Sequence, residues 1–413
     1  MRSRFLATAT ALVIGVAAPA FADERATATG AVTDAAGAPL EHATVLVYEA
    51  RVKKGYSIYC PTCWVDCGKH AFTDAAGRYT IAGLNPDLHF KLLVLKDGYS
   101  AAFIDKVDPA NGPAPAAALK PRPPIEDLSQ VVRGRLVDAR GNPVRDAIVE
   151  QAGVTYRGPR GLGRTFGPVD WIDLVAVSNE KGEFEIAYSK PAVEMTLNVS
   201  PRGMAPKIFN LPTGPDRKTM TVTEGATVRG RLLGPDGKPV ANAEVGISTH
   251  SRNSGSTLPE VRIGTREDGT FAITNVPAGR IWNLYARMDS IAARGMASAM
   301  LPCETKDDGQ EVDLGDIRLL PAYTLRGRVV LTDGKPLPPD IRVTLGADWG
   351  TDAQMTSLVT DGTFEFKGLA RGVYSLAPAL HSYKLADGAT GEVLVDRDRK
   401  EVVLRMEPTP ARP

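Results

Sequence analysis

One phrase occurs four times in this chain and constrains its fold more than any other feature. Each copy reads as a strand, a turn in which Pro follows Gly by two positions, and a second strand. The copies are "TGAVTDAAGAPLEHATV" from Thr29, "RGRLVDARGNPVRDAIV" from Arg133, "RGRLLGPDGKPVANAEV" from Arg229 and "RGRVVLTDGKPLPPDIRV" from Arg326. Because they begin about one hundred residues apart, the size of a domain, they predict four tandem domains rather than a solenoid of short repeats.

A second phrase follows the first in every copy and places an aromatic residue two positions after a turn glycine. The aromatic residues are Tyr79, Phe184, Phe271 and Phe364. We expect each to begin a strand and to bury its ring in the core. Apolar and polar residues alternate along the strands, which is the period of a strand with one buried face, and no long helical period occurs beyond residues 1–22. The sequence therefore predicts an all-β protein of antiparallel sandwiches.

The two phrases together resemble a known family. The pair "G-x-V-x-D-x-x-G-x-P-L-x-x-A-x-V" and "T-D-x-x-G-x-Y/F-x-I-x-x-L" is similar to that of the carboxypeptidase regulatory-like domain, and the resemblance covers all four copies. It implies a transthyretin-like sandwich of seven strands, with an immunoglobulin-like architecture, in each copy.

The phrases also predict domain boundaries. We expect sandwiches at residues 23–109, 131–224, 225–320 and 321–408, followed by a short tail at 409–413. Residues 110–130 are rich in proline and alanine, so they should form a semi-extended spacer that sets the first domain apart. The later junctions are short, which favours a fairly rigid rod of copies two to four.

The N-terminus predicts export. Arg2 and Arg4 precede an apolar run, and Ala20-Phe21-Ala22 has the small-x-small pattern of a signal peptidase site, so residues 1–22 are interpreted as a cleaved signal. The run is too short to span a bilayer, and the mature chain is expected to have no transmembrane segment. The protein should therefore be secreted or periplasmic. Its 49 basic and 48 acidic side chains nearly cancel, which argues against nucleic acid as a partner.

Catalytic signatures are missing from the sequence. The five histidines form neither the H-x-x-E pair of zinc carboxypeptidases nor H-E-x-x-H. There is also no G-x-S-x-G elbow, phosphate loop or dinucleotide fingerprint. We therefore predict no enzyme but a non-catalytic binding or scaffolding protein of the cell envelope, with an unknown envelope protein or glycan as its partner.

Aromatic residues gather in the segment between the two phrases, which should emerge at one end of each sandwich. The candidates for ligand binding are Tyr56, Tyr59 and Trp64 in the first copy, Trp171 in the second and Trp349 in the fourth. Exposed rings of this kind suit stacking on sugars, which makes carbohydrate binding an alternative function. The competing interpretation is that each ring folds back onto its own domain.

The stretch "YCPTCWVDCGKH" holds three of the four cysteines. In an oxidising compartment we expect a disulfide, with Cys60 paired to Cys67 across a small hairpin and Cys63 left over. Cys303 lies far away in the sequence. The alternatives are a zinc site made by Cys60, Cys63, Cys67 and His70, or a thiol-redox module.

Overall fold

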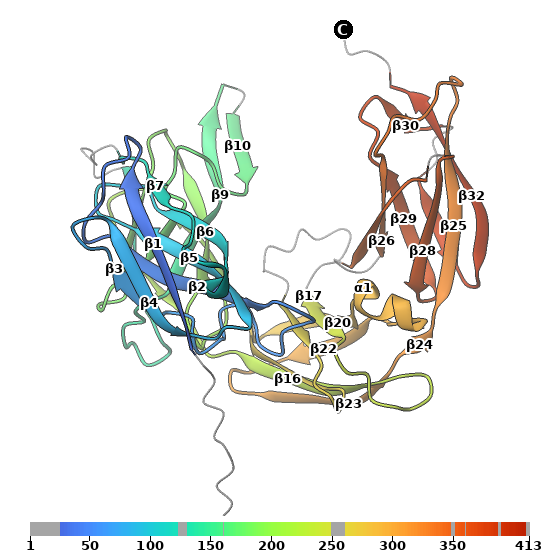
Figure 1. Ribbon diagram of the computed structural model, residues 1–413, viewed down its shortest axis with the longest axis horizontal. Coiled ribbons are helices and arrows are strands. Elements are labelled where there is room, and N and C mark those ends of the chain that lie inside the picture. Colours follow the sequence, from blue (N-terminus) through green and yellow to red (C-terminus); the bar gives the residue numbers. More distant parts are fainter. Residues whose placement is uncertain are drawn as a thin grey trace, which may run out of the picture.

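The computed structural model describes residues 25–122, 130–159, 161–248, 261–347, 352–359, 361–386 and 390–409. Within these ranges the regular secondary structure is nearly all strand, and α1 (Met288–Ile291) is a single helical turn. Four β-sandwiches follow one another along the chain (Figure 1), as the sequence predicts. The predicted signal at residues 1–22 and Trp349 lie outside the described residues.

Each of the first three sandwiches packs a three-stranded sheet against a larger one, and the fourth packs two four-stranded sheets. In the first sandwich, the small sheet has the order β4 (Arg78–Leu84), β1 (Ala26–Asp34), β7 (Ala117–Leu119). The larger sheet has the order β3 (His70–Phe72), β2 (Thr44–Val52), β5 (Leu88–Leu95), β6 (Ala102–Val107). The second sandwich pairs β12 (Glu183–Ala187), β8 (Val131–Val137) and β15 (Lys218–Thr221) with a sheet of β10 (Gly161–Phe166), β9 (Ile148–Gly158), β13 (Glu194–Ser200), β14 (Lys207–Pro212) and β11 (Val175–Val177).

The third and fourth sandwiches repeat this order. The third consists of β19 (Thr270–Val276), β16 (Ala226–Leu233), β23 (Glu311–Arg318) against β18 (Val261–Gly264), β17 (Glu244–Ser248), β20 (Arg280–Ala286), β22 (Leu301–Thr305). The fourth consists of β28 (Thr363–Leu369), β25 (Tyr323–Leu331), β32 (Arg399–Pro408), β30 (Tyr383–Leu385) against β27 (Ala353–Ser357), β26 (Arg342–Ala347), β29 (Gly372–Pro378), β31 (Glu392–Val395). In every sandwich the first strand pairs with a late strand in parallel, so the sheets are not wholly antiparallel.

The two repeated phrases meet in space. Gly134 of the first phrase lies opposite Phe184 of the second in the β8–β12 ladder, and a Cβ on Gly134 would lie 2.3 Å from the Phe184 ring. The same register pairs Gly30 with Tyr79, Gly230 with Phe271 and Gly327 with Phe364. The glycine thus leaves room for a ring to lie across the first strand. All four rings are buried.

Residues 110–122 are not a spacer, contrary to the prediction. Residues 117–119 form β7, which pairs in parallel with β1, and the N–H of Ala114 donates to the carbonyl of Thr29. Leu119 is fully buried in the core of the first sandwich. The segment is therefore the last strand of the first domain, because an apolar Ala-Leu pair offsets the cost of ordering a proline-rich stretch.

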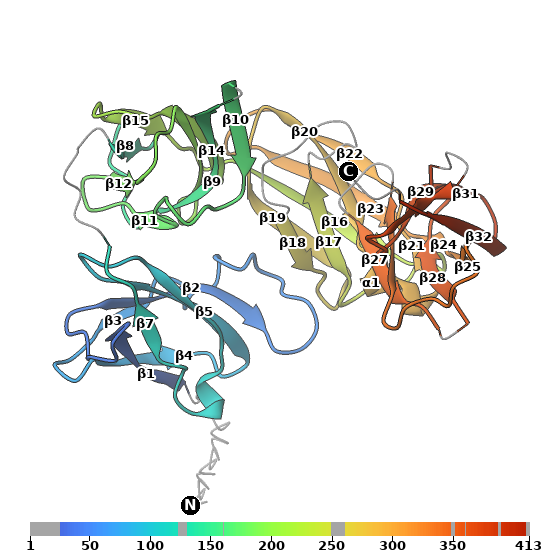
Figure 2. The same cartoon turned by 90° about the horizontal axis from the view of Figure 1, so that it is seen from above.

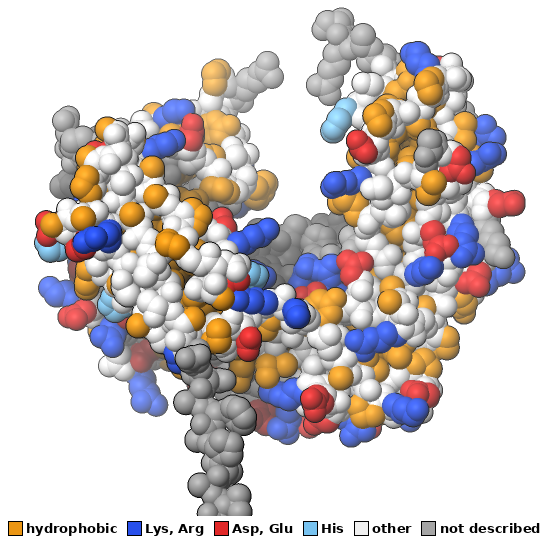
Figure 3. Space-filling model, viewed as in Figure 1, with side chains coloured by type: hydrophobic (Ala, Val, Ile, Leu, Met, Phe, Trp, Pro, Cys, Tyr) orange, Lys and Arg blue, Asp and Glu red, His pale blue; other side chains and the backbone are white. Residues whose placement is uncertain are grey.

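The first sandwich packs against the second. A small apolar cluster joins Tyr48 and Leu93 of the first domain to Ile148 and Val175 of the second. The domains form a U in which the first two make one arm, the third the base and the fourth the other arm (Figures 1 and 2). Charged side chains of both signs are interspersed over the visible face (Figure 3). The first domain is therefore not set apart, and copies two to four follow the bend of the U instead of the predicted rod.

The third and fourth sandwiches share a buried junction. Met288 of α1 lies in the core cluster of the fourth domain. Its backbone N–H donates to Oδ2 of Asp352 at 2.9 Å, and Nε of Arg287 lies 3.7 Å from Oδ1 of the same carboxylate. A side chain of one domain thus completes the core of the next.

We expect Gly134→Ala to destabilise the second sandwich by about 1–3 kcal/mol, because the new methyl group overlaps the Phe184 ring. For a domain of this size, each kcal/mol lowers the melting temperature by about 4–8 °C. Scanning calorimetry of the full chain measures the shift. Gly158→Ala in the same domain is the control, since its nearest neighbour would lie 3.7 Å from the added Cβ. Equal melting of the two variants would contradict the proposed role of the glycine.

Candidate functional site

The cysteine loop, residues 53–69, connects β2 to β3. Its disulfide joins Cys60 to Cys63, with Cα atoms 5.0 Å apart. The predicted pairing of Cys60 with Cys67 is wrong. The turn at Pro61 and Thr62, in which the N–H of Cys63 donates to the carbonyl of Cys60 at 3.0 Å, brings the nearer cysteine into reach. A disulfide across two intervening residues leaves Cys67 as a free thiol.

The zinc alternative is not formed. Two of its four ligands, Cys60 and Cys63, are joined to each other, and the His70 ring is exposed at the edge of the loop. Burial raises the pKa of the Cys67 thiol to about 11, and its Sγ lies 3.3 Å from the carbonyl oxygen of Pro61. Across the residues that the structure describes, no group of three His, Cys, Asp or Glu side chains could hold a metal ion. Cys303 is buried in the third sandwich and is also a free thiol.

The cysteine loop docks on the third sandwich, a contact that the sequence analysis missed. The N–H of Tyr56 donates to Oδ1 of Asn242 at 3.0 Å, and the N–H of Gly264 donates to the carbonyl of Ser57 at 2.5 Å. The disulfide and Tyr59 line a small cavity of about 90 Å³ together with Val261, Ile263 and Ile273 of the third domain. Residues of the first and third domains therefore meet across almost two hundred positions of sequence.

One sequence signal for this contact exists. Gly264 stands directly before the second phrase of the third copy, where the other copies have Phe72, Val177 and Ser357. A Cβ at Gly264 would lie 2.6 Å from the backbone oxygen of Tyr56. A side chain at this position would therefore keep the loop away from β18, so a glycine found in one copy alone marks a surface that another segment approaches.

The predicted aromatic residues do not form one surface. Tyr59 and Trp64 meet edge to face with ring centroids 4.9 Å apart, and Trp64 packs on the core of its own domain. Tyr59 stays 46% exposed, whereas Tyr56 is half-buried at the contact with the third domain. Trp171 lies in the second sandwich and packs on that core. The rings thus largely fold back onto protein.

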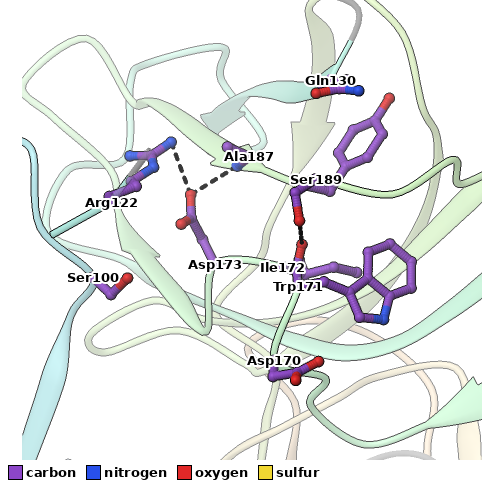
Figure 4. A pocket seen from close by; sticks show the side chains of 10 residues that line it. Ser100, Arg122, Gln130, Asp170, Trp171, Ile172, Asp173, Ala187 and Ser189 are labelled. Atoms are coloured by element: carbon purple, nitrogen blue, oxygen red, sulfur yellow. Dashed lines mark hydrogen bonds and ion pairs between the residues drawn. The ribbon is translucent and has the colours of Figure 1, made fainter. Parts of the chain in front are cut away.

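Trp171 borders a pocket between the first two sandwiches (Figure 4). The pocket has a volume of about 220 Å³ and takes its wall from both domains. Its lining residues are Ser100 and Arg122 from the first domain and Gln130, Asp170, Trp171, Ile172, Asp173, Ala187, Tyr188 and Ser189 from the second. It is a concave site with aromatic and polar groups together, which is the usual composition of a ligand pocket.

An ion pair crosses the wall of this pocket. Nη2 of Arg122 lies 2.9 Å from Oδ2 of Asp173, which also accepts a hydrogen bond from the N–H of Ala187 at 2.8 Å (Figure 4). Burial raises the pKa of Asp173 despite these partners. In the part of the chain that the structure describes, Nε and Nη2 of Arg122 are both buried without a hydrogen bond of acceptable geometry, so the contact of Nη2 with Asp173 is an ion pair only. The sequence analysis named neither residue, because Arg122 lies in the supposed spacer.

Comparisons with known proteins place the chain in no family. No family model and no curated protein matches it. Among solved structures, a streptococcal ancillary pilin is similar at 13% identity and a TM-score of 0.24 over 68% of this chain and 99% of the pilin. The TIE protein of Bacillus anthracis is similar at 13% and 0.20 over 94% and 75%, and the minor pilin of Streptococcus agalactiae at 14% and 0.23 over 46% and 98%. At these values the likeness carries no argument about function. None of the described helices has the length and apolar character needed to cross a membrane.

We expect the double substitution Cys60→Ser and Cys63→Ser to loosen the docked loop. Losing a cross-link that closes so short a loop costs about 2 kcal/mol in the chain-entropy description. The amide of Gly264, which donates to Ser57, should then exchange with deuterium roughly tenfold faster or more. The amide of Thr265 donates to Ala243 within the third domain and serves as the internal control. Unchanged exchange at Gly264 would show that the disulfide does not hold the contact.

Proposed function

We propose that this protein is an exported, non-catalytic scaffolding and binding protein of the cell envelope, built from four carboxypeptidase regulatory-like domains. The observation that carries the proposal is the double anchoring of the first domain. It packs on the second through Tyr48 and Ile148 and on the third through the cysteine loop. Tandem domains joined only by linkers would move independently, whereas these hold their outer loops at set distances.

The fourth domain extends the same construction. Met288 inserts into its core, so the junction of the third and fourth domains buries a side chain of one domain in the other. Such an arrangement supports a role in presenting surfaces to partners. The loops that differ between the copies would then supply the contacts, since loops carry function on a rigid sandwich.

The disulfide supports the assignment to an exported protein. Disulfides persist in oxidising compartments and are rare in the cytosol. The Cys60–Cys63 bond joins two residues of the loop that docks on the third domain. The disulfide and the predicted signal therefore support the same compartment.

Fractionation of cells that express residues 1–413 tests export. We expect a chain that begins at residue 23 in the periplasm or medium, with two thiols, Cys67 and Cys303, alkylated after denaturation and four after reduction. The Cys60→Ser variant should show three without reduction, because Cys63 becomes free. A cytosolic chain that keeps residues 1–22 and has four free thiols would overturn the proposal.

Cross-linking of intact cells tests the scaffolding role. An amine-reactive cross-linker should join the protein to other envelope components in adducts heavier than one copy. A protein recovered only as the uncross-linked monomer, after efficient labelling of its lysines, would contradict this role and leave export unaffected.

A further inference from the structure

We propose that the pocket around Trp171 binds one neutral saccharide unit of a glycan. The inference rests on the proposed binding role and names the class of ligand and its site. It differs from the carbohydrate alternative of the sequence analysis, which relied on exposed loop aromatics at the ends of separate sandwiches. Only Trp171 lines this pocket, and most of its partners were not candidates.

The size of the pocket suits a small ligand. Its volume of about 220 Å³ is below the roughly 300–1,000 Å³ typical of pockets for drug-sized molecules. A single sugar ring is a ligand of this smaller class. The pocket is not enclosed, so the rest of a glycan could continue outside it.

The chemistry of the wall matches both faces of a sugar. Trp171, Ile172 and Tyr188 offer apolar surface on which the C–H face of a ring can pack. The Gln130 amide can both donate and accept hydrogen bonds, as sugar hydroxyls do, and the Ser189 hydroxyl, which donates to the carbonyl of Trp171 at 3.4 Å, can still accept one. A ligand with apolar and hydroxyl surfaces on the same ring satisfies both sets of groups.

The unpartnered donor on Arg122 favours a hydroxyl-rich ligand. Its Nε is buried and makes no hydrogen bond in the described structure. A buried donor without an acceptor costs about 1–3 kcal/mol, so a ligand oxygen that accepts from it gains this amount in part. Because this donor has no solvent-accessible surface, a ligand oxygen would reach it only after the Arg122 side chain turns toward the pocket.

The charges of the wall favour a neutral ligand over an anion. Arg122 is paired with Asp173 at 2.9 Å, and the lining also contains the carboxylate of Asp170. Nζ of Lys190 lies 5.8 Å from the centroid of the Trp171 ring. Since the positive side chains are matched by carboxylates, a phosphate or carboxylate would meet repulsion as well as attraction. An uncharged sugar is not repelled by the carboxylates and can still form hydrogen bonds with the wall.

Titration calorimetry of the mature, full-length protein tests the proposal with three neutral probes: cellohexaose, maltohexaose and chitohexaose. We expect at least one probe to bind. Trp171→Ala and Arg122→Gln should each weaken its binding by tenfold or more, because the first removes the apolar platform and the second the Nε donor. Two separate variants are used because a single substitution could abolish binding simply by unfolding the domain.

The matched control is Phe209→Ala. Phe209 packs partly buried on the same core as Trp171 and lies under Lys207 at 5.3 Å, but it does not line the pocket. It should lose comparable stability and keep wild-type affinity. The inference is overturned if no probe binds, if Trp171→Ala and Arg122→Gln bind like the wild type, or if Phe209→Ala loses affinity equally. The wild-type protein is also tested for export, thiol content and cross-linked adducts. If those results hold while no sugar binds, the saccharide inference fails and the proposed scaffolding role does not.

Discussion

The close approach of an aromatic ring to a glycine in the first strand organises every domain of this protein. In the second sandwich the Phe184 ring occupies the space that a side chain at Gly134 would need. The turn glycine two residues before the ring then lets its own carbonyl accept a hydrogen bond from the first strand, as Gly182 does from Leu136 at 2.8 Å. The ring and the turn together therefore determine the register between the first strand and the strand that carries the ring. The remaining strands then pair with a sheet whose register is already set.

The contacts between domains depend on features that differ among the copies. The disulfide closes a tight turn in the longest stretch between β2 and β3, and that turn meets the third domain where Gly264 leaves space. A cross-link limits the conformations available to the loop before it docks, so less entropy is lost on contact. The repeated core thus builds the domains, whereas residues that differ among the copies, in the cysteine loop, at Gly264 and in the apolar cluster with the second domain, hold the first domain in place.

The pocket at Trp171 is a consequence of domain docking. Arg122 comes from the end of the first domain and Asp173 from the second. They line one wall because the apolar faces of β2 and β9 bring the two domains together. Pockets often form at such junctions, because two convex domains leave a concave seam between them. The pocket therefore depends on the domain arrangement, since any change that separates the first two domains also dismantles it.

The sequence by itself determined the number of domains, their all-β class and the strands that bury Tyr79, Phe184, Phe271 and Phe364, because these depend on short-range alternation and turn chemistry that repeat four times. It did not determine the partner of Cys60, since both Cys63 and Cys67 lie within reach of a flexible chain and only the turn at Pro61 chooses between them. Residues 117–119 were also misjudged, because a short parallel strand has no turn signal that links it to its neighbour. The contact of Tyr56 with Asn242 and the pairing of Arg122 with Asp173 were decided by tertiary structure alone. Packing between whole domains brings these residues together, and it leaves no periodic pattern along the chain.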